Sequence, residues 1–416
     1  MNKLRVALFR TTTVLLILAL TACSAPPPEL ASTPWRGALE LPGGELPFTI
    51  RFKDTAAGLS AVIENGAERL EVPRVQLDGD RLELEFPAFN NRIALTREGD
   101  TWRGDLTLIK RGGKRQVMPL VLSAGQTHRF FEGEQDVNAD FGGRWAVEFQ
   151  DDDGKTTQAV GEFEQLNGKV TGTFRTPTGD YRYLAGDVRD DLLYLSTFDG
   201  AHAFLFVARQ GENGRITGDF WSGTKWHETF TATRNATVEL PDANALSKIR
   251  AGVERINFSF PDTAGDMVSL DDARFSGKVV VLALAGSWCP NCHDEAAFLS
   301  PFHKARADDG LEVVGLMFEH LDEFNAAAVQ VNAFRDKFDI DYPLVVAGFS
   351  DKKQATESLG LLDEVIAYPT MIVLDRNRAV RLVHTGFNGP GTGVHYDEFR
   401  ASFGALIDEL LQEDPA

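Results

Sequence analysis

The chain has few cysteines, a deficit of basic residues and no long apolar run, and each shortage excludes a class of protein. Three cysteines among 416 residues are too few for a scaffold held together by disulfides. No stretch of 18 or more apolar residues occurs, so the sequence predicts no integral membrane helix. Lys and Arg number 42 against 61 Asp and Glu, and a net charge of −19 repels phosphates. We therefore expect no nucleic-acid partner.

The remaining composition is that of a globular protein. Hydrophobic residues make up 43% of the chain and charged residues 25%, which is enough to build sizeable cores. A length of 416 residues predicts two or three domains.

The N-terminus predicts export and lipid attachment. Residues 1–22 read as a signal peptide, with a basic start and an apolar run at 14–20 that is too short to span a bilayer. Because the sequence LTAC ends at Cys23 as in a bacterial lipobox, we expect a lipid on Cys23; an ordinary secretory signal is the alternative. The proline-rich residues 23–33 then form a tether. This predicts a lipid-anchored protein on the periplasmic face of a bacterial membrane, with the outer membrane slightly favoured.

Residues 34–130 and 140–236 read as two β repeats. Both have short alternating apolar and polar runs separated by Asp-Gly, Asn-Gly and Gly-Gly turns. Trp35 opens a run that recurs at Trp145, and other matches recur at similar offsets. This pattern predicts a duplicated antiparallel region, as two small sandwiches or one barrel-like body; chance similarity between hairpins is the alternative.

After a linker at 237–252, residues 253–416 change to an α/β pattern. The continuous apolar run 279–285 predicts a strand buried on both faces. Strand–helix alternation predicts a largely parallel sheet with right-handed crossovers. The expected elements are strands at 279–285, 311–318 and 371–374 and helices at 295–308, 322–338 and about 399–411.

The sequence WCPNC, residues 288–292, is the strongest chemical motif. It follows the buried strand and opens a helix, where Pro290 suits the first turn. The helix dipole there stabilises a thiolate, so the pKa of the first thiol is expected to fall from about 8.5 toward about 3.5–7.5. We therefore expect Cys289 to be the nucleophile, reachable by other proteins, and Cys292 to resolve the mixed disulfide.

The motifs around WCPNC, in their order and spacing, carry a resemblance to a known family. Residues 253–412, about two fifths of the chain, resemble the thioredoxin-like domain of the TlpA/ResA group of bacterial thiol–disulfide oxidoreductases. The matching segments are Phe260-Pro261-Asp262, Val268-Ser269-Leu270, Gly277-Lys278, WCPNC, Glu312-Val313-Val314-Gly315 and Tyr368-Pro369-Thr370.

The resemblance implies roles for three further residues. Pro369 corresponds to a cis-proline that faces the two cysteines, and together with Trp288 it frames the substrate groove. Glu295 corresponds to an acidic residue that tunes the thiols or relays their protons. The implied partners are exported proteins that carry disulfides and an upstream membrane or periplasmic thiol donor, and no cofactor or metal is expected.

Two positions depart from thioredoxin proper. Ala283 stands where thioredoxin has a buried aspartate, and Ala297 where a helix-kinking proline is common, with Pro301 four residues later. Neither departure removes a thiol.

The direction of the redox reaction is harder to predict. Asp294 and Glu295 are acidic, and no Lys or Arg lies within ten residues of Cys289 in the sequence. Carboxylates disfavour the thiolate and make a better reductant, which predicts a protein-disulfide reductase. The CPxC dipeptide is typical of oxidising relatives, so an oxidase is the alternative.

Four other interpretations stay open. A metal site could recruit His293, His384 or His395, although a structural zinc needs four ligands. A peroxiredoxin-like peroxidase needs Thr or Ser three residues before its attacking cysteine, where this chain has Gly286. Loop 386–393 is glycine-rich but lacks a phosphate-binding lysine, so we expect an ordered surface loop near the site. Finally, the β region could capture a ligand while the redox domain acts as a sensor.

Overall fold

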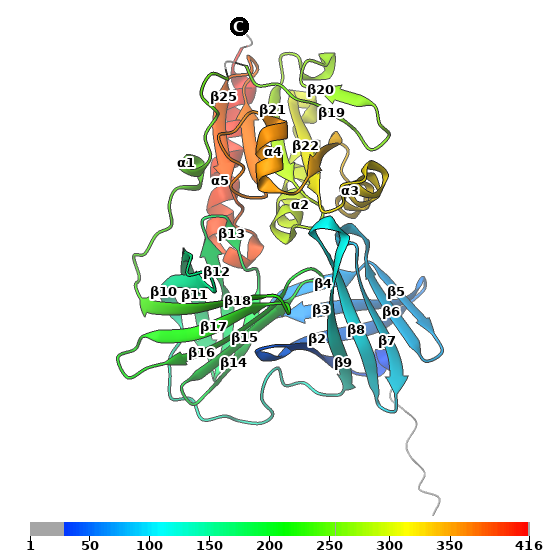
Figure 1. Cartoon of the computed structure of the whole chain (residues 1–416), viewed down its shortest axis with the longest axis vertical. Helices are drawn as coiled ribbons and strands as arrows, with labels where there is room; N and C mark the ends of the chain where they lie inside the picture. The colour runs from blue at the N-terminus through cyan, green and yellow to red at the C-terminus, as the bar shows by residue number, and fades with distance from the viewer. Residues whose placement is uncertain (1–28, 254, 415–416) are drawn as a thin grey trace, which may run out of the picture.

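The computed structural model describes residues 29–253 and 255–414 (Figure 1). The predicted signal peptide and the lipid site at Cys23 lie outside the described residues. Two antiparallel β bodies lie side by side, and an α/β body rests on both of them (Figure 1). Within the described residues no helix is both long and apolar enough to cross a membrane.

The first β body is one antiparallel sheet of nine strands in the order β4-β3-β2-β1-β9-β8-β7-β6-β5. Alternating side chains of its strands are buried, as the period-2 pattern predicted. The strands are β1 (Trp35–Leu41), β2 (Gly44–Thr55), β3 (Gly58–Asn65), β4 (Glu68–Val72), β5 (Arg74–Asp78), β6 (Arg81–Phe86), β7 (Asn91–Glu98), β8 (Thr101–Lys110) and β9 (Lys114–Ala124).

The second β body is a closed barrel. Its order is β11-β10-β18-β17-β16-β15-β14-β12-β13, and a further β11–β12 pairing closes the ring. Closure leaves most strands without an unpaired edge. The strands are β10 (Gly143–Asp151), β11 (Thr156–Leu166), β12 (Lys169–Thr176), β13 (Gly179–Asp180), β14 (Leu184–Arg189), β15 (Leu192–Phe198), β16 (Ala203–Gln210), β17 (Ile216–Ser222) and β18 (Trp226–Arg234).

The two bodies repeat the same construction. In each, the first strand pairs with both the second strand and the last. Trp35 and Trp145 are each 1% exposed. Their indole N–H groups donate to backbone carbonyls shortly upstream, at Leu30 (3.0 Å) and Phe141 (2.9 Å). The predicted all-β N-terminal region is confirmed, in the form of two barrel-like sheets.

The segment between the barrel and the α/β body is partly structured. Helix α1 (Ala243–Leu246) packs against strand β25 (Val380–Thr385). The hydroxyl groups of Ser247 and Thr385 lie 2.7 Å apart. The predicted linker at 237–252 therefore docks on the domain that follows it.

The α/β body has a five-stranded sheet in the order β23-β22-β21-β24-β25. The pairings of β21 with β22 and of β22 with β23 are parallel, whereas those of β24 with β21 and β25 are antiparallel. The prediction of a largely parallel sheet is therefore wrong for the half formed by β24 and β25. The short connection between these two strands permits only an antiparallel pair. The strands not yet named are β21 (Val279–Ala285), β22 (Leu311–Glu319), β23 (Leu344–Phe349) and β24 (Thr370–Leu374), with a separate β19 (Ser259–Pro261) and β20 (Met267–Ser269) hairpin.

Helices cover this sheet, and the thioredoxin-like α/β prediction is confirmed. All seven residues of β21 are buried, as the apolar run predicted. The predicted helix at 295–308 begins five residues earlier, because the chain turns into the helix at Pro290. The helices are α2 (Pro290–Lys304), α3 (Phe324–Phe338), α4 (Lys352–Leu359) and α5 (Val394–Gln412).

Candidate active site

Cys289 and Cys292 form a disulfide at the start of α2. Cys289 is the N-cap residue of the helix, and its sulfur accepts a hydrogen bond from the backbone N–H of Cys292 at 3.2 Å. A sulfur in this place faces free amides and the positive end of the helix dipole, which is the arrangement that stabilises a thiolate.

The sulfur pair is almost fully covered. Cys289 is 5% exposed and Cys292 is 0% exposed. Ala88, from the first β body, belongs to the same buried cluster as both cysteines. The expectation that Cys289 is open to other proteins is therefore wrong for this conformation.

Trp288 and Pro369 both border the disulfide. The Tyr368–Pro369 peptide bond is cis, and the carbonyl oxygen of Tyr368 lies 3.4 Å from the sulfur of Cys289. Trp288 donates from its indole N–H to the carbonyl of Phe318 at 2.8 Å and stacks on the ring of His320, with centroids 4.2 Å apart. These contacts hold the Trp288 ring in place and set the Tyr368–Pro369 peptide beside Cys289.

Glu295 and Asp294 do not act as free negative charges. Glu295 is 2% exposed, its Oε1 has no hydrogen-bond partner among the described residues, and burial raises its pKa well above the usual range. Asp294 forms an ion pair with Arg182 of the second β body. The premise from which the sequence analysis derived a reductase, two carboxylates opposing the thiolate, is therefore wrong.

A second buried carboxyl group lies close to the motif. Glu319, at the end of β22, accepts hydrogen bonds from the backbone N–H of Ser287 at 2.9 Å and from its hydroxyl at 2.6 Å. Burial raises the pKa of Glu319 to about 7, although both bonds to Ser287 act to lower it.

His293 is an interior packing residue. Its ring stacks on Phe89 with centroids 3.9 Å apart, and its Nδ1 lies 2.9 Å from the ammonium of Lys337. The opposite ring nitrogen lies 2.6 Å from the carbonyl oxygen of Ser287. Burial, and then the charge of Lys337, lower the pKa of His293 well below its usual range.

The three histidines considered for a metal have separate partners. His293 binds Ser287, His384 lies 2.7 Å from the Asn244 amide oxygen, and His395 lies 3.1 Å from Glu162. In the described part of the chain no three His, Cys, Asp or Glu side chains come together as they would around a metal ion.

The short strand β13 of the barrel contacts Asn291, the third residue of the CPNC motif. The amide nitrogen of Asn291 donates to the carbonyl of Phe387 at 3.1 Å and approaches that of Asp180 at 3.4 Å. A Cβ atom at Gly179 would lie 2.5 Å from the same nitrogen. The barrel and the redox motif are therefore in van der Waals contact.

Loop 386–393 takes part in the same contact. The backbone N–H of Gly389 donates to the carboxylate of Asp180 at 2.6 Å, and Phe387 is 2% exposed. The loop lies near the redox motif, as expected, but it is not an open surface loop, because the barrel covers most of it.

Sequence reasoning missed the residues that surround the motif. Phe89 and Arg182 come from the β bodies, far upstream of Cys289, and no local pattern marks them. Glu319 had a signal, because it ends the strand next to the one that leads into WCPNC. The carboxyl ends of neighbouring parallel strands meet at one edge of a sheet, where sites form.

Comparison with known proteins gives one family match and several relatives. Residues 251–383 match the model of the AhpC/TSA family. "Thioredoxin-like protein YneN" of Bacillus subtilis is 30% identical over 138 residues, covering 33% of this chain and 73% of the relative. "Thiol-disulfide oxidoreductase ResA" of Halalkalibacterium halodurans is 26% identical over 142 residues, covering 34% and 71%. "Thiol:disulfide interchange protein DsbE" of Vibrio cholerae is 24% identical over 172 residues, covering 41% and 82%.

Solved structures also resemble part of the chain. A secreted thiol-disulfide isomerase from Corynebacterium glutamicum is 21% identical, with a TM-score of 0.31, and the match covers 42% of this chain and 97% of that one.

Proposed function

Because this chain belongs, through its C-terminal domain, to the thioredoxin-like family and is distantly homologous to thiol–disulfide oxidoreductases of the ResA and DsbE type, we propose that it is a protein-disulfide reductase. The domain is a thiol–disulfide oxidoreductase domain with its CxxC pair at Cys289 and Cys292. The observation that carries the proposal is the position of Cys289, at the N-cap of α2 and beside the Tyr368–Pro369 peptide.

The proposed reaction moves two electrons. The thiolate of Cys289 attacks one sulfur of a substrate disulfide, and the other substrate sulfur leaves as a thiolate and takes up a proton. Cys292 then loses its proton and attacks the sulfur of Cys289, which releases the second substrate thiol. The substrate gains two electrons and two protons, the protein keeps the Cys289–Cys292 disulfide, and an upstream thiol donor restores the dithiol.

Glu295 is proposed as the proton carrier for Cys292. The two residues lie three positions apart on α2, which places them on the same face of the helix. Because burial raises its pKa, Glu295 keeps its proton closer to neutral pH than an exposed glutamate does, and it can exchange that proton with a buried thiol. An open Oε1 is consistent with such an exchange.

Burial supports the reducing direction. The start of α2 stabilises a thiolate at Cys289, but the apolar surroundings of Cys292, the more deeply buried of the two, raise the pKa of that thiol. A couple whose reduced form is poorly stabilised is a stronger reductant. Cys289 is 5% exposed and Cys292 is 0% exposed. Oxidation of substrate thiols is the alternative direction, which the midpoint potential distinguishes.

The cellular setting is proposed from the sequence. The LTAC motif at Cys23 and the proline-rich tether support lipid anchoring at the periplasmic face of a membrane, with exported disulfide proteins as substrates. The β region contacts the redox motif, so we propose that it controls the access of these substrates to Cys289. A sensor in which the β region captures a partner is the second candidate.

Gly286, three residues before Cys289, does not support peroxidase chemistry, which needs threonine or serine there. A Cβ atom on Gly286 would lie 2.3 Å from the indole nitrogen of Trp288 and 2.7 Å from the carbonyl oxygen of Phe318. No threonine or serine fits three residues before Cys289.

Insulin reduction tests the proposal. The full chain, kept reduced by dithiothreitol, is expected to accelerate insulin precipitation, and Cys289→Ser to abolish the acceleration. Equal rates for the two proteins contradict an enzymatic role of Cys289. In that case a partner that the Cys289→Ser variant still binds favours the sensor.

A further inference from the structure

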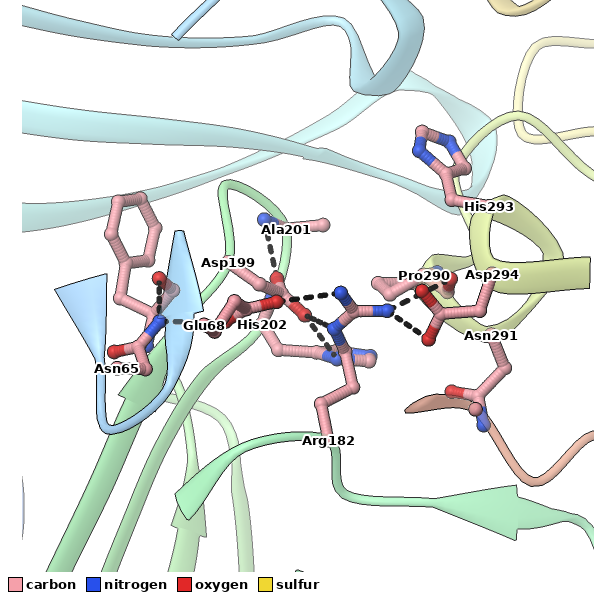
Figure 2. Close-up of polar contacts among 12 residues, drawn as sticks. Asn65, Glu68, Arg182, Asp199, Ala201, His202, Pro290, Asn291, His293 and Asp294 are labelled. Atoms are coloured by element: carbon pink, nitrogen blue, oxygen red, sulfur yellow. Dashed lines mark hydrogen bonds and ion pairs between the residues drawn. The ribbon is translucent and has the colours of Figure 1, made fainter. Parts of the chain in front are cut away.

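Arg182 is a buried cation that the β barrel presents to the redox helix. It lies between β13 and β14, is 8% exposed, and has a left-handed backbone with φ of 56°. Such a φ is uncommon for a residue other than glycine. Figure 2 shows its guanidinium pointing at the start of α2.

The guanidinium joins all three bodies of the protein. It forms an ion pair with Asp294 of α2 and lies 3.4 Å from the carbonyl oxygen of Pro290. It also binds Glu68 of the first β body at 2.6 Å and Asp199 of the barrel at 3.3 Å (Figure 2). Five donors in a planar fork allow one arginine to hold several carboxylates, which a lysine does less well.

The guanidinium of Arg182 compensates the charges of several buried carboxylates around it. Other titratable groups that face this cluster include Asp180, Tyr183, His293 and Lys337. Burial and then the charge of Asp294 raise the pKa of Asp180 to about 6. His202 pairs with Asp199 at 3.1 Å. Without Arg182, three largely buried carboxylates would stand close to the start of α2 with less compensation.

We propose that Arg182 is a positioning residue for the redox site: by holding Asp294 and the Pro290 carbonyl at the start of α2, it sets how readily Cys289 carries the thiolate charge. The sequence shows no basic residue near the motif, and the barrel supplies one through space. This inference rests on the proposed disulfide exchange and identifies what regulates its equilibrium.

The charges at the start of α2 determine in which direction the pKa of the Cys289 thiol shifts. A cation close to the start of α2 stabilises a thiolate there, and a bare carboxylate destabilises it. Loss of Arg182 removes the cation and also unmasks Asp294, so both effects raise the pKa of the Cys289 thiol. Loss of the Asp294 charge alone has the opposite effect, because Arg182 remains in place through Glu68 and Asp199.

The equilibrium with glutathione measures the effect in the full chain. The reaction converts the Cys289–Cys292 disulfide and two glutathione molecules to the dithiol and one glutathione disulfide. For Arg182→Met we expect the equilibrium constant for reduction of the protein to fall about tenfold, or about 30 mV. The pKa of Cys289, from alkylation rates against pH, rises by about one unit. Arg182→Lys, which keeps the charge, should recover most of the shift.

Two comparisons keep the test decisive. Arg175→Met removes another buried barrel arginine, paired with Glu162 at 3.0 Å, and should leave the equilibrium unchanged. Asp294→Asn should shift the equilibrium in the opposite direction to Arg182→Met, and it decides the matter if Arg182→Met does not fold. Equilibrium constants within twofold of wild type for folded Arg182→Met, or a shift of the same sign in Asp294→Asn, overturn the inference. A wild-type protein that does not exchange with glutathione instead overturns the proposed function.

Discussion

Glu295 and Glu319 are buried carboxyl groups on either side of the redox motif. Glu295 lies on α2 after Cys292, and Glu319 binds Ser287 before Trp288. Burial raises the pKa of both, so they stay protonated closer to neutral pH than exposed glutamates do. Burial therefore affects both carboxyl groups in the same way, and their roles can be tested separately: that of Glu295 by activity and that of Glu319 by stability.

Glu295→Gln is expected to slow insulin reduction about 10²-fold, because glutamine fills the same volume but cannot transfer a proton. The pH–rate profile, measured between about pH 5 and pH 9, should also lose the dependence that the carboxyl group causes. Glu409→Gln, at an exposed position on α5, is the matched control and should keep the wild-type profile. A Glu295→Gln protein with the wild-type rate and profile contradicts the proton-carrier role.

Glu319 makes stability depend on pH. Its pKa is about 7 in the folded protein against a usual value of 4.5, so between these values the unfolded chain loses its proton first. Stability from this group is present below about pH 4.5 and is lost as the pH rises toward 7, by about 3 kcal/mol. In Glu319→Gln the amide oxygen can still accept from the Ser287 backbone N–H, and the amide N–H can donate to the Ser287 hydroxyl oxygen. This variant should remove this part of the pH dependence.

Urea unfolding at several pH values measures the difference between the variant and wild type. Glu312→Gln, on the same strand but only partly buried and paired with Lys278, is the control and should follow wild type. A constant difference between Glu319→Gln and wild type from pH 4.5 to pH 7.5 would mean that Glu319 does not titrate in this range.

At the residue scale, the sequence predicted the residues of the local motif and missed the contacts made by residues far away in the chain. The WCPNC motif identified Cys289 and Cys292, and the resemblance pointed to Pro369, which lies beside Cys289 in the fold. The ion pair of Asp294 could not be predicted, because its partner Arg182 comes from a loop about a hundred residues upstream. Residue type alone does not show whether a carboxylate is paired.

Elements with one dominant signal were predicted closely. Strand β21 has the predicted bounds, because seven consecutive apolar residues fit a strand buried on both faces. Helix α2 starts earlier than its apolar periodicity indicates, because Cys289 caps it and Pro290 opens it. Polar residues of this turn such as Asn291 and His293 are also buried and do not show in an apolar pattern. The direction of β24 depends on connections and pairing, which no single strand pattern encodes.

A substitution at Gly179, in strand β13, tests the contact between the barrel and α2. Alanine there would place its Cβ 2.5 Å from the Asn291 amide nitrogen, on a backbone with φ of 144°. We expect Gly179→Ala to lower the free energy of unfolding by about 1–3 kcal/mol and to loosen the cover over Cys289. Urea unfolding and the alkylation rate of reduced Cys289 measure the two effects.

Gly44→Ala is the matched control for Gly179→Ala. Gly44 has a comparable φ of 121°, but its Cβ would meet nothing within 4 Å. It therefore carries the backbone strain without the contact, and should leave the alkylation rate unchanged. Equal alkylation rates in the two variants would mean that the loop does not cover the site.

At the scale of the whole molecule, both β bodies lie against the redox face of the α/β body (Figure 1). The first β body contributes Phe89, which stacks on His293, and Arg111, which pairs with Asp351 at 3.1 Å. The barrel contributes Arg182 and the Gly179 loop. A protein substrate therefore reaches Cys289 only if these contacts open.

Phe89→Ala is expected to increase the alkylation rate of reduced Cys289 by a bulky maleimide several-fold, because the ring stacked on His293 is lost. Phe52→Ala removes a phenylalanine that is also 5% exposed, from the core of the same sheet, and controls for general destabilisation. Peptide mass spectrometry identifies the modified cysteine. Equal acceleration in both variants would attribute the effect to unfolding rather than to opening.

The most direct test of the central claim uses Cys292→Ala, which removes the resolving thiol. Reduced and mixed with insulin, this variant is expected to hold a mixed disulfide that dithiothreitol releases and that peptide mass spectrometry locates on Cys289. The Cys289→Ser, Cys292→Ala double variant should hold none. Absence of the Cys289 adduct, or an equal amount in the double variant, would contradict disulfide exchange at this site.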